Sequence, residues 1–181
     1  TAETIQMAAE QTERLTKLVK TLLDMSELQT VARTDEIELG ALVEEVLADL
    51  EPLARERGIV LNAGCCGELY MTGSDILIYR VVFNLVENAI KYNKENGKVN
   101  IWVGNTLNGK KVIVQDTGIG IPKEHQDRIF ERFYQGKKKE GSTGLGLAIA
   151  DTICKMQALR LCYEYKSGEH CFTLYASTHN Q

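Results

Sequence analysis

The sequence predicts an α+β fold of two layers, with a mixed and mostly antiparallel sheet and helices on one of its faces. Short alternating segments occur in pairs joined by tight turns, as with residues 98–104 and 111–115 on either side of Asn108-Gly109, a strong hairpin signal. Longer amphipathic segments separate these pairs. Strands gathered as hairpins, with helices between them, are typical of one helical layer on one sheet.

The composition is that of an ordinary soluble domain. Of the 181 residues, 44% are hydrophobic and 25% charged, and 21 basic against 25 acidic side chains leave a net charge of −4, which does not favour nucleic acid as a partner. No apolar run approaches the roughly 18 residues of a membrane helix and no signal peptide opens the chain, so we expect this fragment in the cytoplasm. The five cysteines lack paired C-x-x-C spacing, which favours free thiols over a metal site or disulfide framework.

Residues 1–30 have the pattern of one long amphipathic helix of about eight turns. Its apolar positions, with no Gly or Pro between them, are Ile5, Ala8, Leu15, Leu18, Val19, Leu22, Met25 and Leu28. So wide a stripe needs a partner, which is either the folded domain of the same chain or, as we favour, another helix of a dimer bundle. Residues 31–34 form a polar joint to the next element.

The first half of the remaining chain is predicted to contain three strands and two helices. Residues 36–39 alternate as a strand, and residues 41–57 form a helix that is expected to bend or break near Pro52. Residues 59–63 and 69–71 are candidate strands around a turn at 64–67. Ser74 can cap the helix that follows it and carries residues 84–92.

The second half supplies the hairpins and a second helix. After the hairpin around Asn108-Gly109, residues 123–130 form a short helix. Residues 134–143 are too polar to pack and are expected to form a mobile lid. Residues 144–157 form the second long helix, and a hairpin of residues 159–165 and 170–176 completes the sheet.

Two short runs have the contents of a nucleotide site. Asn84, Asn88 and Lys91 are spaced so that a helix places two carboxamides and an ammonium on one face, which suits a metal-bound polyphosphate. Asp116 ends an apolar run and is followed by Gly118 and Gly120, which allow the backbone to turn sharply and approach a flat ligand.

A third run, residues 141–147, leads from a flexible stretch into an apolar helix. Its free N–H groups and the positive end of the helix dipole can bind an anion. It is not a Walker loop, because no Gly-Lys-Ser/Thr follows, and it is not a Rossmann fingerprint, because no strand precedes it.

Taken in order, these runs resemble the N, G1, F and G2 boxes of the ATP-binding domain of sensor histidine kinases, within the GHKL superfamily. The matching runs are Asn84-Leu-Val-Glu-Asn88-Ala-Ile-Lys91-Tyr92, Asp116-Thr-Gly118-Ile-Gly120-Ile-Pro122, Ile129-Phe-Glu-Arg-Phe133 and Gly141-Ser-Thr-Gly144-Leu-Gly146-Leu147. The resemblance covers roughly residues 35–176 and implies a Bergerat-type two-layer sandwich.

The resemblance also implies a domain organisation. Residues 13–26 are similar to the second helix of the dimerisation and phosphotransfer hairpin of histidine kinases. Residues 1–34 are therefore expected to be part of that hairpin with its linker, and residues 35–178 the catalytic ATP-binding domain. The phosphoacceptor helix is expected outside this chain, since the first histidine here is His125.

ATP and Mg²⁺ are the ligands that the resemblance implies. Asp116 would accept a hydrogen bond from the adenine amino group, Asn88 would bind magnesium, and Lys91 would neutralise phosphate charge. Tyr92 would pack on the base, and Arg132 is a candidate for the γ-phosphate. The other nucleotide-binding residues would be Asn84, Gly118, Gly120, Ile121, Thr143, Gly144, Leu145, Gly146 and Leu147. His125 and His170 are expected at the surface.

The implied reaction is in-line transfer of the γ-phosphoryl group to a histidine outside this chain, for relay to the receiver domain of a response regulator. The parent would be a homodimer, and whether it is anchored in the bacterial cell membrane stays open. Asn84 stands where the hydrolysing relatives (gyrase, MutL and the related chaperones) have a Glu that activates water, which argues for transfer. The alternatives are a non-catalytic nucleotide-binding or dimerisation module, an anti-sigma-type serine kinase, and an ATPase.

Two places depart from the family pattern. The lid is short, which puts its contacts in doubt. Gln157-Ala158 replaces the usual Gly-Gly, which puts the packing of the last hairpin in doubt.

Overall fold

The computed structural model describes residues 1–10, 13, 35–107, 109–118, 121, 123–131 and 146–177. The chain forms two compact units, Thr1–Ala32 and Arg33–Gln181. In the first unit residues 2–10 are helical, as predicted for the start of the N-terminal helix, and their Ile5 and Met7 side chains are exposed. Most of the remainder of that predicted helix lies outside the described residues.

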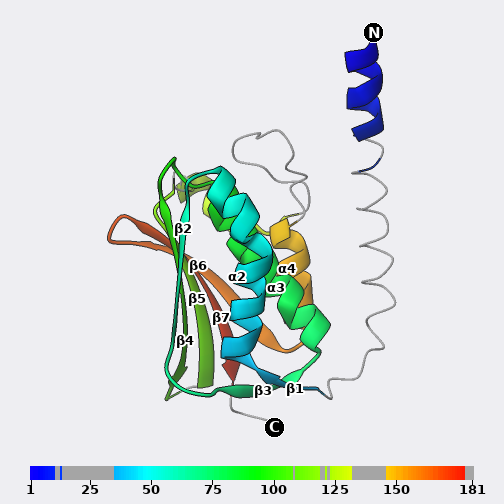
Figure 1. Cartoon of the computed structure of the whole chain (residues 1–181). Helices are drawn as coiled ribbons and strands as arrows, with labels where there is room; N and C mark the ends of the chain where they lie inside the picture. The colour runs from blue at the N-terminus through cyan, green and yellow to red at the C-terminus, as the bar shows by residue number, and fades with distance from the viewer. Residues whose placement is uncertain are drawn as a thin grey trace. The chain divides into compact units, whose positions relative to one another are not determined.

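The second unit is a two-layer α+β sandwich, which confirms the predicted fold class (Figure 1). One layer is a five-stranded sheet in the order β2-β4-β5-β7-β6, and the helices lie on one of its faces. The strands are β2 (Val60–Cys65), β4 (Lys98–Thr106), β5 (Gly109–Asp116), β6 (Leu159–Lys166) and β7 (Glu169–Ser177). The helices are α2 (Leu39–Glu56), α3 (Asp75–Lys91) and α4 (Gly146–Met156), with a short 3₁₀ helix at Lys123–Arg128.

Strand pairing follows the predicted hairpins and adds three pairings between distant segments. β4 pairs with β5, β5 with β7 and β6 with β7, all antiparallel. The two candidate strands around the turn at 64–67 do not pair with each other. Instead β2 lies parallel to β4, and β3 (Tyr70–Gly73) pairs antiparallel with β1 (Asp35–Glu38) in a separate two-stranded sheet.

The two long helices begin at side-chain caps. The carboxylate of Glu38 accepts hydrogen bonds from the backbone N–H groups of Gly40 (3.1 Å) and Ala41 (2.5 Å), so α2 begins directly after β1. Ser74 caps α3 as predicted, accepting from Leu77 N at 3.4 Å. The expected break at Pro52 does not occur, because Leu50 and Ala54 are buried on either side of it and hold α2 onto the domain.

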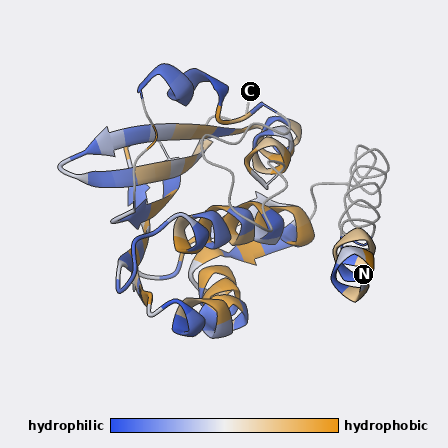
Figure 2. Cartoon of the chain, turned by 90° about the horizontal axis from the view of Figure 1, so that it is seen from above, coloured by the Kyte–Doolittle hydropathy of each residue, from blue (hydrophilic) through white to orange (hydrophobic). Residues whose placement is uncertain are grey.

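The core lies between the helices and the sheet. On β4, Val99, Ile101 and Val103 are at most 2% exposed, and the same face continues through alternate positions of β5 and β7. The helices carry hydrophobic residues on one side and hydrophilic residues on another (Figure 2). Each layer therefore buries one face, as the sequence periodicity predicts.

The other face of the sheet carries Trp102. It alternates with Ile101 and Val103 and so points away from the helical layer. Its ring lies over Gly104, where a Cβ would overlap with the indole, and Lys111 Nζ lies 5.6 Å from the ring centroid. The Trp102 ring therefore occupies the space that a side chain at position 104 would fill.

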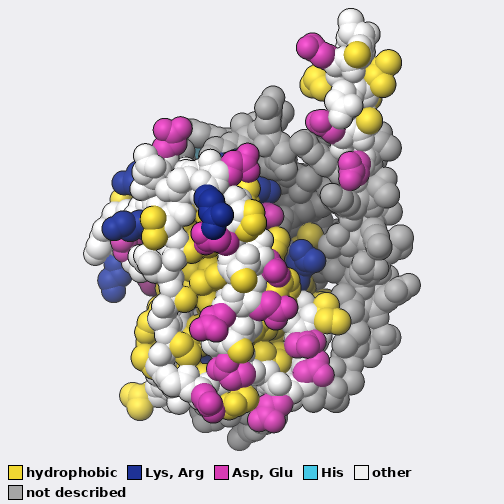
Figure 3. Space-filling model, in the orientation of Figure 1, with side chains coloured by type: hydrophobic (Ala, Val, Ile, Leu, Met, Phe, Trp, Pro, Cys, Tyr) yellow, Lys and Arg dark blue, Asp and Glu magenta, His cyan; other side chains and the backbone are white. Residues whose placement is uncertain are grey.

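The face that carries α2 is acidic (Figure 3). Its exposed carboxylates on α2 and β1 are Asp35, Glu36, Glu44, Glu45, Asp49, Glu51 and Glu56. Such a surface repels polyanions. Within the described part of the chain, no helix is both long and apolar enough to span a membrane.

Candidate functional site

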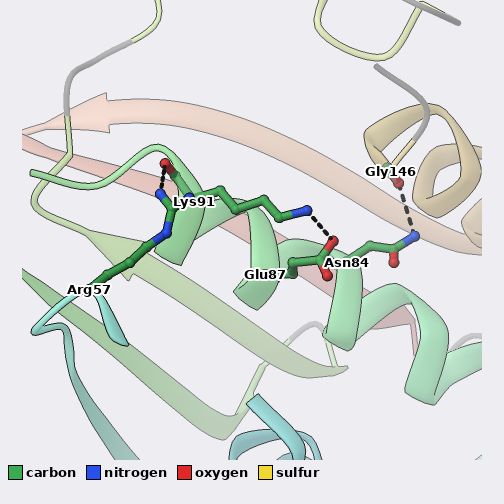
Figure 4. Close-up of polar contacts among 5 residues, drawn as sticks. All are labelled: Arg57, Asn84, Glu87, Lys91 and Gly146. Carbon is green, nitrogen blue, oxygen red and sulfur yellow. Dashed lines mark hydrogen bonds and ion pairs between the residues drawn. The ribbon is translucent and has the colours of Figure 1, made fainter. Parts of the chain in front are cut away.

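The predicted polar face of α3 lies beside the start of α4. Asn84 is 8% exposed, and its Nδ2 donates a 3.1 Å hydrogen bond to the carbonyl oxygen of Gly146 (Figure 4). Asn84 thus joins the middle of α3 to the first residue of α4. Asn88 is one turn further along α3 and half-buried, on the side that the i, i+4 spacing shares with Asn84.

Lys91 lies at the last turn of the same helix. Its Nζ is 3.3 Å from Glu87 Oε1, and each side chain is about a third exposed (29% and 32%). Its carbonyl oxygen accepts a 2.9 Å hydrogen bond from the Arg57 guanidinium (Figure 4). A partly exposed pair of this kind contributes little to stability, so the Lys91 ammonium can turn to a stronger anion at small cost.

Asp116 is a buried acceptor at the end of β5. It is 7% exposed, and its Oδ1 accepts a 2.7 Å hydrogen bond from the backbone N–H of Gly118. Burial raises its pKa to about 6; the Gly118 hydrogen bond opposes this shift, and the charge of Glu169 adds to it. A buried carboxyl group with a raised pKa is typical of functional sites.

Gly118 brings the loop after β5 against the end of α3. A Cβ at Gly118 would lie 2.6 Å from Asp116 Oδ1 and 2.6 Å from the Tyr92 carbonyl oxygen. Only glycine fits such a close approach. The structure therefore brings together the Tyr92 end of α3 and the Asp116–Gly118 segment, as the sequence predicted.

A small polar network fixes this meeting point. Thr117 Oγ1 donates to Asn93 Oδ1 at 3.2 Å and accepts from the backbone N–H of Lys98 at 3.0 Å. Asn93 Nδ2 donates to the Lys98 carbonyl oxygen at 3.0 Å. The segment after α3, the start of β4 and the residue after β5 are thus joined, and no pattern in the sequence marks Asn93 or Thr117 as site residues.

The remaining predicted residues divide into two groups. Gly146 and Leu147 form the first turn of α4, and Ile121 is half-buried with its carbonyl oxygen accepting a 3.1 Å hydrogen bond from Gln126 Nε2. Five predicted site residues lie outside the described residues: Gly120, Arg132, Thr143, Gly144 and Leu145. The predicted lid, residues 134–143, lies outside them as well.

His170 is not the surface residue that the sequence suggested. It is 5% exposed and stands opposite Asp116 in the register of β5 and β7. The reason is the alternation of β7, which places His170 on the same face as buried Phe172 and Leu174. That alternation was readable in the sequence, and it would have placed His170 beneath the loop of Asp116.

Comparison with known proteins agrees with this arrangement. The sequence pattern of the family described as "Histidine kinase-, DNA gyrase B-, and HSP90-like ATPase" matches residues 73–179, from the start of α3 to the end of β7. The chain belongs to this family. Because the family is one of ATPases, ATP is the ligand of this domain.

Several of its relatives are named sensor histidine kinases. "Sensor histidine kinase RppB" of Synechocystis sp. is 38% identical over 148 residues, 77% of this chain and 33% of RppB. The nucleotide-free catalytic domain of histidine kinase ThkA has a TM-score of 0.74 at 27% identity, covering 81% of this chain and 96% of that one. Histidine kinase AdeS of Acinetobacter baumannii has a TM-score of 0.77 at 27% identity, covering 94% and 82%.

The domain is thus the ATP-binding catalytic domain of the sensor histidine kinase type. The chain spans about a third of the length of the curated relatives it matches (33% and 34%).

Proposed function

We propose that this domain binds ATP with magnesium and transfers the γ-phosphoryl group to a histidine outside the chain, for relay to a response regulator. The observation that carries the proposal is Asp116, a buried carboxylate at a strand end, with the end of α3 against the adjoining Gly118. In this type of reaction the protein mainly positions groups and neutralises charge, which is what these residues can do.

The base would bind at Asp116. Oδ1 already accepts the Gly118 N–H, so Oδ2 would accept the adenine amino group. The absence of a side chain at Gly118 supports close approach of a flat ring. Tyr92 and Ile121, both half-buried around this loop, would pack on the base.

The phosphates and the metal would lie along α3 and the start of α4. The Asn88 carboxamide would supply an oxygen ligand, the kind that Mg²⁺ prefers, and Lys91 would leave Glu87 for a phosphate. Bound Mg²⁺ would neutralise phosphate charge. The N–H groups of Gly146 and Leu147 would face the phosphates, and Asn84 would hold that turn in place. By resemblance, Gly120, Arg132, Thr143, Gly144 and Leu145 would complete the site.

The environment of Asn84 supports transfer over hydrolysis. A carboxamide cannot take a proton from water at neutral pH, and this one donates its hydrogen bond to Gly146. No general base therefore stands at the position where the hydrolysing relatives carry Glu. The acceptor would be the phosphoacceptor helix of a longer parent, with residues 1–34 as part of its dimerisation hairpin and residues 35–178 as the catalytic domain.

The base site is tested by Asp116→Ala in calorimetric titration with ATP. Loss of a hydrogen bond to a charged acceptor costs about 1.5–3 kcal/mol, or roughly 10- to 150-fold in affinity. Asp151→Ala is the matched control, because Asp151 lies on α4 and pairs with Lys155 at 2.9 Å. Unchanged affinity in Asp116→Ala would remove Asp116 from the site.

The transfer step is tested with labelled ATP, magnesium and a separately supplied phosphoacceptor hairpin. The chain should leave itself unlabelled and should label the histidine of the hairpin slowly. The encounter is bimolecular without the covalent link, and lost proximity can add on the order of 7 kcal/mol to a barrier. Acid-labile phosphate on the isolated chain would contradict an external acceptor. Failure to label any histidine-bearing hairpin would favour a non-catalytic nucleotide-binding module.

A further inference from the structure

Next to the end of β5, a half-buried tyrosine and a buried histidine form an aromatic pair. His170 stacks against Tyr163 on β6, with centroids 5.9 Å apart and planes 9° apart. The Tyr165 ring also contacts His170, with centroids 4.8 Å apart. Tyr163 also packs on Phe172 at 5.0 Å. The imidazole therefore has little freedom to move.

The pair is hydrogen-bonded to both described ends of that loop. The Tyr163 hydroxyl bonds to His170 Nδ1. His170 also bonds to the backbone of Gly118, and Tyr163 to the backbone of Ile121. The Ile121 carbonyl is in turn held by Gln126 Nε2 at 3.1 Å. Gly118 in turn donates to Asp116 Oδ1 at 2.7 Å. One chain of contacts thus runs from β6 and β7 to the buried carboxylate.

The protons in this chain can be assigned. The Gly118 bond favours the protonated imidazole, so the ring donates to the Gly118 carbonyl oxygen. The Ile121 bond favours the ionised phenol, so Tyr163 accepts from the Ile121 N–H. Burial lowers the pKa of His170, which keeps the ring neutral with a single N–H. That N–H serves Gly118, and Nδ1 is left to accept the Tyr163 O–H. Every donor then has an acceptor.

We propose that Tyr163 and His170 are positioning residues for the nucleobase, which hold the backbone at Gly118 and at Ile121 so that Asp116 selects a base carrying an amino group. The inference rests on the proposed role of Asp116. Neither side chain needs to touch the nucleotide. They act on binding through the backbone groups of Gly118 and Ile121. Substituting them should therefore change the discrimination between bases and leave the binding of the phosphates unaltered.

The test compares ADP with inosine diphosphate, which has a carbonyl oxygen in place of the amino group. Tyr163→Phe keeps the ring and removes the hydroxyl. It should weaken ADP binding about 3- to 10-fold, leave inosine diphosphate binding nearly unchanged, and so lower the ratio of the two affinities. Tyr165→Phe removes a hydroxyl from the next residue on the same face of β6, where the side chain is 58% exposed, and should preserve the ratio. A structural role alone would not alter the ratio.

Two substitutions of the histidine separate its polar contacts from its packing. His170→Phe should lower the ratio at least as much as Tyr163→Phe. His170→Gln, which retains one donor and one acceptor, should restore the ratio of affinities part of the way to its original value. An unchanged ratio in folded Tyr163→Phe and His170→Phe would overturn the proposal.

A measurement on the unmodified protein serves if these variants do not fold. Nitrogen-15 NMR of His170 at neutral pH should show a protonated Nε2 and an unprotonated Nδ1. The opposite tautomer, or an imidazolium, would overturn the proposal. Asp116→Ala separates failure of the proposed base site from failure of the positioning role. If it retains discrimination, the base site itself is wrong; if it loses discrimination while Tyr163→Phe keeps it, only the positioning role fails.

Discussion

The side-chain carbonyl oxygen of Gln157 accepts a 2.9 Å hydrogen bond from the backbone N–H of Ser74. Both residues are 2% exposed. Ser74 caps the start of α3 and Gln157 directly follows α4, so this contact joins the two helices that carry the polar face of the site. The departure from Gly-Gly at this position therefore does more than alter the packing of the last hairpin.

Gln157→Met should destabilise the domain by about 1–3 kcal/mol, because it leaves a buried N–H without its acceptor while keeping the volume nearly constant. Urea unfolding followed by circular dichroism measures the change. Lys155→Met is the control, since Lys155 is exposed on the preceding turn and its loss should cost no more than about 0.5 kcal/mol. Equal midpoints for the two variants would show that the contact contributes nothing.

Asp116→Asn should stabilise the nucleotide-free domain at neutral pH. The folded-state pKa of about 6 exceeds the ordinary 3.8. The carboxyl therefore favours the folded state below about pH 4, and this contribution is lost as pH rises through about 6. Ionised Asp116 then costs up to about 3 kcal/mol at pH 7, and asparagine avoids that cost while still accepting from Gly118.

Urea unfolding at pH 7 and at pH 4 measures this effect, with exposed Asp127→Asn as the control. The gain from Asp116→Asn should shrink at the lower pH. A gain that did not change with pH would have a cause other than ionisation. The same substitution should abolish discrimination for adenine. We therefore expect Asp116→Asn to raise the stability of the domain and to weaken its binding of the nucleotide.

Ala158→Gly should raise the free energy of unfolding by roughly 0.5–1 kcal/mol. Ala158 has φ of +54°, a left-handed conformation that costs an L side chain about 1–2 kcal/mol, partly offset by the greater freedom of glycine in the unfolded chain. Asn96 has φ of +56° and, being asparagine, tolerates it, so Asn96→Gly should change stability much less. Equal effects of the two would mean that backbone conformation does not set the difference.

Asn88→Ala should weaken nucleotide binding roughly tenfold or more with magnesium and much less when the metal is chelated. Titration calorimetry with and without a chelator gives both values. Asn62→Ala is the control, because Asn62 lies on β2 and donates to Asn100 Oδ1 at 3.1 Å. Equal losses under the two conditions would make Asn88 structural rather than a metal ligand.

Local features of the fold were predictable because their causes are local. β4 and β5 pair on either side of the predicted turn, and Ser74 caps the start of α3. The parallel pairing of β2 with β4 and the pairing of β1 with β3 could not be predicted, since no short-range pattern states which distant strand is a neighbour. Pro52 lies within a helix because burial of Leu50 and Ala54 outweighs a local preference.

Residues of the candidate site could be proposed from the sequence where they follow a helical spacing or end a strand. Asn84, Asn88 and Asp116 were proposed in this way, whereas Asn93, Thr117 and Tyr163 contribute through the backbone groups they bind. Such contacts depend on which loop lies above which strand. His170 was missed for a different reason, since its side of β7 was readable from the strand's alternation.

Trp102 is the single tryptophan of the chain, and its indole covers Gly104 on the face of the sheet opposite the helices and Asp116. Intrinsic fluorescence excited at the indole band will therefore follow loss of the sheet, and it should stay almost constant while nucleotide is added. An optical signal for binding needs a second fluorophore on the helical side, and Tyr92→Trp would place one at the end of α3 beside Gly118, with Trp102→Phe to silence the native emission.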